Sequence, residues 1–129
     1  MGQIKGFHHL AMNVSNFDAS KSFYTDVLGF SAAREWGQTG SRALMLDAGN
    51  GNYVELFEKE SVDAGAGGII HYALRVDNCD EILDRVRKSG AEITVESKDV
   101  DIPATPAYPV RIAFFKGPSG EIVELFQER

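Results

Sequence analysis

Apolar and polar residues alternate along two stretches of the chain. FHHLAMNV at 7–14 and IIHYALRV at 69–76 both place apolar side chains at every second position. Because successive side chains of a β-strand point to opposite faces, this period of two predicts a strand at each place. Each stretch is followed by an Asn-x-Asp sequence, which is a favourable helix start. The pattern therefore predicts a strand followed by a helix, twice.

The two predicted helices are followed by further strands. Apolar residues recur at helical spacing over 17–28 and over 79–89, and these segments end at Gly29 and Gly90. Glycine commonly ends a helix because it accepts the left-handed backbone conformation there. Alternation and bounding turn residues predict six more strands: 31–36, 42–47, 52–58, 92–97, 110–116 and 121–127. Each half of the chain is thus predicted to form a βαβββ module.

The two halves also repeat each other in sequence. GNYVELF at 51–57 matches GEIVELF at 120–126 at five of seven positions. HLAMNVSNFD at 9–18 matches HYALRVDNCD at 71–80 at five of ten positions. Self-similarity at a fixed spacing indicates a duplicated structural unit.

The repeat sets the predicted domain organisation. We predict a single α+β domain over 1–129. Module one is expected at about 4–62 and module two at about 68–129, with a Gly-rich hinge at 63–68. The hinge leads into a strand rather than a helix, so it does not fit a phosphate-binding loop.

Strand alternation places four titratable side chains opposite the apolar faces. In the repeated VELF strands the valine and leucine side chains share one face, which suits packing under a helix, and Glu55 and Glu124 take the other. By the same alternation His9 and His71 point away from the apolar faces of their strands. The other residues predicted on these faces are the candidates for substrate contact: Asn13, Tyr53, Phe57, Arg75 and Phe126.

These four side chains favour a metal site. If the two sheets curve around a shared cavity, two imidazoles and two carboxylates converge in an apolar-walled pocket, where carboxylates are costly without a cation. We predict that His9, Glu55, His71 and Glu124 ligate one divalent ion. Imidazole and carboxylate ligands without a thiolate suit Zn²⁺, Ni²⁺ or Co²⁺, with Mn²⁺ or Fe²⁺ as alternatives, better than Ca²⁺. Such an ion keeps coordination positions open for chemistry.

Composition narrows the class of partner. The 129 residues carry a net charge of −6 and no run of Lys or Arg, which argues against nucleic-acid or anionic-membrane binding. No window approaches the roughly 20 apolar residues of a membrane span. The single cysteine, Cys79, cannot form an internal disulfide and is predicted to be inert packing. We expect a cytoplasmic protein that binds a small molecule.

Several motifs together resemble a known family. GFHHLAMNV, SFYTDVLGF, NYVELF, GIIHYALRVDN and GPSGEIVELF are similar to stretches of the vicinal oxygen chelate superfamily, and within it of the glyoxalase I-like proteins. The resemblance covers nearly the whole chain. It implies that the modules form one curved, cup-like mixed sheet around the ion, with helices outside, usually in a homodimer. His9, Glu55, His71 and Glu124 fall at the family's four ligand positions.

The resemblance also implies a reaction. A glyoxalase I-like protein, related to lactoylglutathione lyase, is a metal-dependent lyase or isomerase that moves a proton next to a carbonyl through a metal-chelated enediolate. Glu124, with Glu55 as the second candidate, would move the proton. The superfamily also contains ligand-binding and resistance proteins without turnover and metal-dependent dioxygenases, and these remain alternatives.

One position departs from the family pattern. The bacterial glyoxalase I pattern has an Arg four residues after the first ligand His, where it helps to hold glutathione, and this chain has Asn13 there. An Arg stands at the matching place in the other module, Arg75. A guanidinium on that face predicts a small anionic oxo or hydroxy compound as substrate and leaves the use of glutathione open.

Two further predictions concern residues outside the ligand set. His8 is one position out of phase with His9 and is predicted to be structural or partly exposed. Segment 99–109, with three of the four prolines, is predicted to be a long loop that either covers the pocket or serves as a stiff connection. The sequence leaves open the substrate, the native metal, and whether the ligands meet within one chain or across a dimer.

Overall fold

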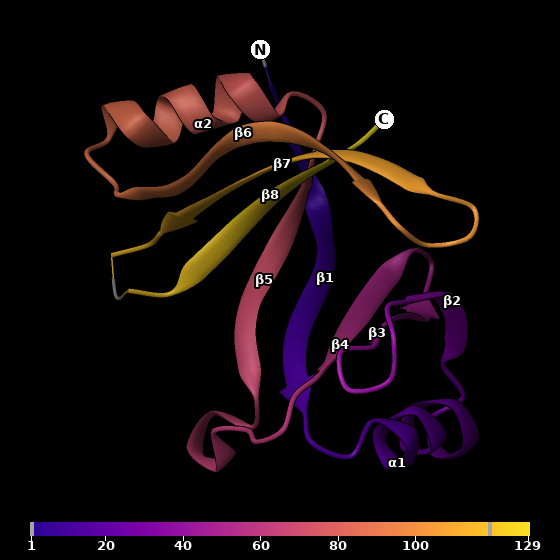
Figure 1. The fold of residues 1–129 in the computed structure, drawn as a ribbon. Helices are drawn as coiled ribbons and strands as arrows, with labels where there is room; N and C mark the ends of the chain where they lie inside the picture. The colour runs from indigo at the N-terminus through magenta and orange to yellow at the C-terminus, as the bar shows by residue number, and fades with distance from the viewer. Residues whose placement is uncertain (1, 119) are drawn as a thin grey trace. The chain divides into compact units, whose positions relative to one another are not determined.

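The computed structural model describes residues 2–118 and 120–129, so Met1 and Ser119, the latter within the quoted stretch GPSGEIVELF, lie outside the described residues. Two βαβββ modules follow each other along the chain, which confirms the α+β class (Figure 1). The elements are β1 Ile4–Val14, α1 Phe17–Ser22, the π-helical turn η1 Phe23–Val27, β2 Ser31–Trp36, β3 Ala43–Gly49, β4 Asn52–Glu58, the 3₁₀ turn η2 Ala64–Ala66, β5 Ile69–Val76, α2 Cys79–Lys88, β6 Ile93–Ile102, β7 Tyr108–Lys116 and β8 Ile122–Glu128.

The chain divides into two compact units whose limits differ from those of the modules. Unit 1 contains the residues up to His8 together with His71–Ile102 and Ala107–Arg129. Unit 2 contains His9–Ile70 and the short segment Pro103–Pro106. Strand β1 therefore contributes its first half to one unit and its second half to the other.

Unit 2 has the strand order β2-β3-β4-β1, in which β1 and β4 are parallel and the other neighbours are antiparallel. Helix α1 begins after Asn16, whose Oδ1 accepts a hydrogen bond from the Ala19 amide at 3.1 Å. Phe17, at the first helical position, is buried. It joins a core with apolar residues of three strands: Val14, Leu44, Leu46 and Leu56.

Unit 1 repeats this plan with the order β5-β8-β7-β6, in which β5 and β8 are parallel. Helix α2 lies along β6 in Figure 1. Asn78 caps it, because its Oδ1 accepts a hydrogen bond from the Glu81 amide at 3.1 Å. The buried core beneath the helix consists of Val76, Cys79, Ile82, Leu83, Ala113 and Leu125. Cys79 is fully buried, as predicted.

The helix predicted over 17–28 changes its winding within its length. Helix α1 gives way to the π-helical turn η1, where the Leu28 amide donates to the Phe23 carbonyl at 3.2 Å. Apolar spacing fixes the side that faces the core but does not separate a regular turn from one widened by a residue, so the sequence did not predict η1. Among the described residues no helix is long and apolar enough to cross a membrane.

The prediction of a long loop over 99–109 is wrong. Strand β6 continues to Ile102 and β7 begins at Tyr108, with Val100 opposite Val110 in an antiparallel ladder. The polar sequence ESKDVD and the flanking prolines concealed these strand ends. Pro109 is the second residue of β7, near the start of the strand, where a missing amide donor is tolerated. The connection is a short hairpin tip, and a role in covering a pocket stays a prediction for that tip.

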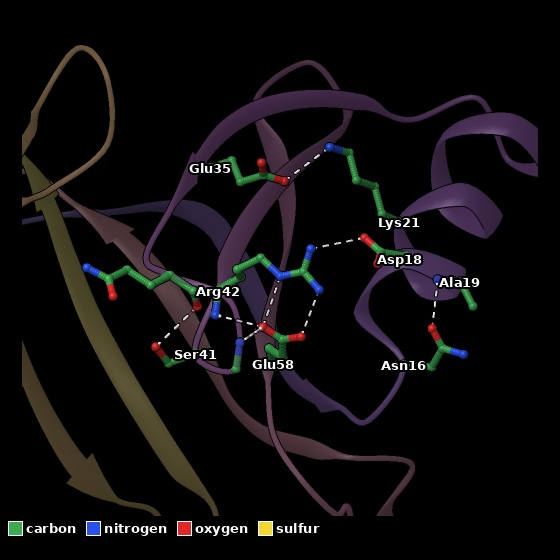
Figure 2. Close-up of polar contacts among 10 residues, drawn as sticks. Asn16, Asp18, Ala19, Lys21, Glu35, Ser41, Arg42 and Glu58 are labelled. Carbon is green, nitrogen blue, oxygen red and sulfur yellow. Dashed lines mark hydrogen bonds and ion pairs between the residues drawn. The ribbon is translucent and has the colours of Figure 1, made fainter.

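A half-buried ion pair fixes the connection between β2 and β3 (Figure 2). Glu58, at the end of β4, accepts hydrogen bonds from the Gly40 and Arg42 amides at 2.8 and 3.1 Å. Its carboxylate oxygens also accept hydrogen bonds from Arg42 Nε and Nη2 at 2.9 and 2.8 Å. The guanidinium lowers the pKa of Glu58 to about 2. Arg42 also bonds Asp18 at 3.1 Å and lies over the Phe17 ring, so loop, strand end and helix are held together.

Candidate metal centre

The first half of the candidate site lies within unit 2. Strands β1 and β4 run in parallel with Ala11 opposite Glu55, and His9 is two residues before Ala11 on the same face. His9 Nε2 is 3.2 Å from Glu55 Oε1. Both residues are buried, with exposed fractions of 3% and 5%. Alanine at the opposing position leaves room for the imidazole and the carboxylate to meet.

The second half repeats this arrangement within unit 1. Strands β5 and β8 are parallel with Ala73 opposite Glu124, and His71 is two residues before Ala73. His71 Nε2 is 3.1 Å from Glu124 Oε1, and Glu124 is buried. The edge of the Phe114 ring packs against the His71 ring at 5.2 Å between centroids and an angle of 86°. The two sequence repeats therefore hold a histidine nitrogen and a glutamate oxygen in the same arrangement.

The donor set fits a divalent transition metal. Two donors that each lie about 2.1 Å from one ion, at 90–110° to each other, are about 3.0–3.4 Å apart. The distances of 3.2 and 3.1 Å within the two His–Glu pairs lie in this interval. Each pair offers one imidazole nitrogen and one carboxylate oxygen, a combination that suits Zn²⁺ and its neighbours better than Ca²⁺.

Apolar side chains border both carboxylates. Across the antiparallel neighbour of each VELF strand, Met45 is opposite Glu55 and Phe114 is opposite Glu124. Met45 is fully buried, as is Leu56, which follows Glu55. A carboxylate among such neighbours loses hydration and is stabilised by a cation or by hydrogen-bond donors. The same surroundings strengthen any electrostatic interaction that the carboxylate makes.

The predicted substrate-contact residues of module one lie along the His9 face. In the β1–β4 register, Tyr53 is opposite His9 and Phe57 is opposite Asn13. The Asn13 amide donates to the Gly68 carbonyl at 2.7 Å, and Asn13 Oδ1 is buried without a hydrogen-bond partner among the described residues. Gly68 must be glycine here, since a Cβ would lie 2.2 Å from the Asn13 carbonyl oxygen at a φ of +78°.

In module two, Arg75 is held by a residue that the sequence analysis missed. Phe126 is opposite Arg75 in the β5–β8 register, and Arg75 Nε donates to Glu128 Oε1 at 3.0 Å. Glu128 also accepts a hydrogen bond from the Tyr108 hydroxyl. Glu128 is four residues after Glu124, as Arg75 is four residues after His71, so the same alternation could have identified it.

His8 has a structural environment, as predicted, but it is fully buried rather than partly exposed. Its ring stacks on Phe126 at 4.0 Å between centroids, and its Nε2 is 2.7 Å from the Tyr108 hydroxyl oxygen. Because Tyr108 gives its proton to Glu128, His8 Nε2 is the donor in this contact. His8 thus belongs to a polar chain inside unit 1, whereas the neighbouring His9 pairs with Glu55 in unit 2.

Comparison with protein-family models gives one match over nearly the whole chain. Residues 6–125 match the model of the Glyoxalase/Bleomycin resistance protein/Dioxygenase superfamily. The matched range contains all four residues of the two His–Glu pairs.

Individual relatives agree with this match. The lactoylglutathione lyase of Salmonella typhimurium is 30% identical, over 94% of this chain and 91% of the relative. The uncharacterized protein YaeR of Escherichia coli is 30% identical, over 97% of this chain and 98% of its own. Among solved structures, the methylmalonyl-CoA epimerase from Mycobacterium tuberculosis superposes with a TM-score of 0.76 at 25% identity, covering 98% of this chain and 89% of that chain.

Proposed function

Since this chain belongs to the glyoxalase/bleomycin resistance protein/dioxygenase superfamily, we propose that it is a metal-dependent lyase or isomerase that moves a proton next to a carbonyl. The observation that carries the proposal is the pair of buried His–Glu contacts, one in each module, at 3.2 and 3.1 Å. A structural role would not require the same costly buried donors twice at equivalent places.

In this proposal the four side chains of the two pairs hold one divalent ion: His9, Glu55, His71 and Glu124. A bound ion of this kind supplies Lewis acidity toward a carbonyl oxygen of the substrate. The imidazoles act as neutral ligands, and the carboxylates balance the charge of the ion. Zn²⁺, Ni²⁺ or Co²⁺ are the first candidates for the ion, with Mn²⁺ and Fe²⁺ next.

Glu124 is the proposed proton carrier. Its carboxylate is buried between Phe114, opposite on β7, and Phe126, two residues further on β8. The carboxylate can take the carbon-bound proton of the substrate and, after trading it with solvent, return a proton to the carbon. Glu55 occupies the equivalent place in module one and is the second proposed carrier.

Two activities among the relatives suggest substrates to test. One relative is a lactoylglutathione lyase and one structural neighbour is a methylmalonyl-CoA epimerase. We propose that this chain prefers an anionic oxo or hydroxy compound, since Arg75 lies on the face of the second His–Glu pair and Asn13 replaces arginine on the face of the first. Both named activities involve a carbon next to a carbonyl, so one assay design covers them.

The test combines metal analysis with proton exchange. Protein purified without chelator or metal-affinity column should contain about one transition-metal ion per chain. In D₂O it should exchange the carbon-bound proton of methylmalonyl-CoA, or of the methylglyoxal–glutathione adduct, and Glu124→Gln should remove this exchange. Absence of metal, with no exchange restored by any of the five ions, would falsify the enzymatic proposal and favour a binding protein. Oxygen uptake with iron would favour a dioxygenase.

We further propose that the protein is a cytoplasmic homodimer. The dimer follows from the family resemblance, and the cytoplasm from the single cysteine, which cannot form an internal disulfide. Sedimentation velocity at micromolar concentration should give a single species of twice the 14.1 kDa chain mass. A monomeric species with full metal content and proton exchange would reject the dimer without affecting the proposed reaction.

A further inference from the structure

Two polar contacts lie on the same face of β5 and β8, two strand periods apart. His71 contacts Glu124 at 3.1 Å, and Arg75 contacts Glu128 at 3.0 Å. In both contacts the partner stands 53 residues further along the chain. Because the strands are parallel and in register, the second contact follows the first by four residues, about 13 Å along the strands.

We propose that Glu128 is an exchangeable stand-in for an anionic group of the substrate. Its Oε1 engages the Arg75 guanidinium until a carboxylate or phosphate of the ligand takes its place. The metal-binding pair at His71 and Glu124 would hold the reacting end of the same ligand. This inference rests on the proposed function, since it assigns the recognition of the substrate's distal end to the same site.

The surroundings of Glu128 permit exchange, as a comparison with Glu58 shows. Glu58 has a side chain that is 14% exposed, and it accepts hydrogen bonds from two backbone amides as well as from Arg42, so its departure would break all of these bonds together. The side chain of Glu128 is 40% exposed at the end of β8. Its departure breaks the partly exposed ion pair with Arg75, and such pairs contribute little to stability, together with one hydrogen bond from the Tyr108 hydroxyl.

The neighbouring hydroxyl does not depend on Glu128 for its position. Tyr108 is buried, and its oxygen lies 2.7 Å from Nε2 of the fully buried His8. Tyr108 therefore stays in place when Glu128 leaves, and its hydroxyl becomes available as a donor beside the incoming anion. This arrangement favours a group that can accept from both a guanidinium and a hydroxyl.

The exchange gives the site a filter for charge. A carboxylate or phosphate replaces the hydrogen bond and the charge that Arg75 loses when Glu128 turns away. A neutral amide or ester replaces neither fully, so it competes poorly with the resident carboxylate. The site would therefore select anions through the cost of displacing Glu128.

The experiment compares two ligands and three variants. Zn²⁺-loaded and chelator-treated protein is titrated with 2-oxoglutarate and with 2-oxoglutaramate, whose distal group is a neutral amide, by calorimetry. Glu128→Gln removes the stand-in carboxylate. Glu96→Gln is the matched control, because it makes the same charge change in another Arg–Glu pair of unit 1, with Arg87. Arg75→Gln removes the anion partner.

Glu128→Gln should tighten 2-oxoglutarate binding about fivefold, equivalent to about 1 kcal/mol, and should change 2-oxoglutaramate binding less than about twofold. Glu96→Gln should change neither, and Arg75→Gln should abolish the preference for 2-oxoglutarate. In NMR titrations of the wild-type protein the Arg75 Nε–H resonance should move, while that of Arg42 should not. This resonance reports exchange directly and would not respond to a purely structural role of Glu128.

Unchanged or weaker 2-oxoglutarate binding in Glu128→Gln would overturn the proposal and make Glu128 a fixed partner of Arg75. Tyr108→Phe in the Glu128→Gln background supplies an independent check, since it removes the hydroxyl that donates beside the incoming anion and should weaken 2-oxoglutarate binding. Another outcome is that Glu128→Gln tightens 2-oxoglutarate binding in chelator-treated protein although the protein binds no metal and exchanges no proton. That result would reject the proposed function and support the anion site. If metal and proton exchange are present but the effect is absent, only the anion site falls.

Discussion

Each of the two modules contains an equivalent Arg–Asp ion pair, but the other contacts of the two arginines differ. Arg42, directly before β3, donates a hydrogen bond to Asp18 of α1 at 3.1 Å, and Arg111 of β7 donates one to Asp80 of α2 at 3.0 Å. The two arginines stand the same number of residues before the two buried glutamates. Each module thus ties the start of its helix to its third strand with the same pair, although the sequence match quoted above does not include the arginines.

The second partner of each arginine is different. In module one it is Glu58 at the end of β4, which also accepts hydrogen bonds from the Gly40 and Arg42 amides. In module two it is Asp99 of β6, at 3.0 Å from Arg111 Nη1. The residue equivalent to Glu58 is Gln127, whose Oε1 accepts a hydrogen bond from the Cys79 amide at 2.7 Å. The His–Glu geometry is therefore retained in both modules, while the contacts that stabilise each module have changed.

The largest expected effect concerns the His–Glu pairs, which both modules retain. His9→Ala and His71→Ala should each weaken metal binding more than about a hundredfold, because each removes one ligand from a site that still bears the cost of the remaining buried groups. His8→Ala should leave metal stoichiometry unchanged. Competition titration with a chromophoric chelator measures all three. Similar losses for His8 and His9 would show that the strand alternation has been misassigned.

The next largest effect concerns Glu58 and Gln127, which stand at equivalent places but make different contacts. Glu58→Gln should lower the melting temperature at pH 7 clearly more than Gln127→Glu changes it. The folded-state pKa of Glu58, about 2, lies below its ordinary value of 4.5. The stability that Glu58 supplies is therefore complete above about pH 4.5 and is lost as the pH falls through about 2.

Thermal melts of the wild type and Glu58→Gln should accordingly converge as the pH is lowered from 5 to 2. A constant difference across that range would mean that the carboxylate charge is not what stabilises the β2–β3 connection. Gln127→Glu serves as the control, since it introduces a carboxylate at the equivalent place in module two.

A smaller and equal effect is expected at the two helix caps. Asn16 and Asn78 accept the Ala19 and Glu81 amides at the same distance, 3.1 Å. Replacing either by alanine should lower the free energy of unfolding by about 1 kcal/mol, as measured by urea denaturation. A much larger effect at Asn78 would show that its additional contact with Glu81 Oε2, at 2.9 Å, also stabilises α2.

The smallest effect is expected at Cys79, which occupies the place of Phe17 in the other module. It is fully buried, and burial raises the pKa of its thiol. Iodoacetamide at pH 7.5 should therefore leave the native protein unmodified over an hour, whereas the same protein in urea should react fully. Rapid modification under native conditions would reveal local opening at the start of α2.

The sequence predicted the elements well where alternation was regular. β2 and β4 have the predicted limits, and the family resemblance is confirmed by the match over residues 6–125. The extension of β6 was missed because its polar residues lie on an edge strand with one face exposed, so no apolar periodicity marks it. The π-helical turn was missed because it leaves the apolar spacing almost unchanged.

Prediction of the site depended on a repeated signal. His9 and Glu55 could be recognised because His71 and Glu124 recur in the same pattern, and each pair is in contact within its own unit. Glu128 and Tyr108 have no such repeat, and their contact with each other joins residues 20 positions apart on antiparallel strands. Contacts of this kind depend on strand register, which a single sequence specifies only weakly.

The division of β1 between the two units has a consequence for biosynthesis. Residues 2–8 leave the ribosome well before their partners, since Gln3 bonds Asp77, 74 positions later, and His8 bonds Tyr108, 100 positions later. Unit 2 likewise includes Pro103–Pro106 from the second module. Neither unit can therefore be completed on the nascent chain until most of the polypeptide has emerged, and loop closures this long slow folding. A gene cut at the hinge would leave unit 1 without residues 2–8 and unit 2 without Pro103–Pro106, so neither fragment would contain a whole unit.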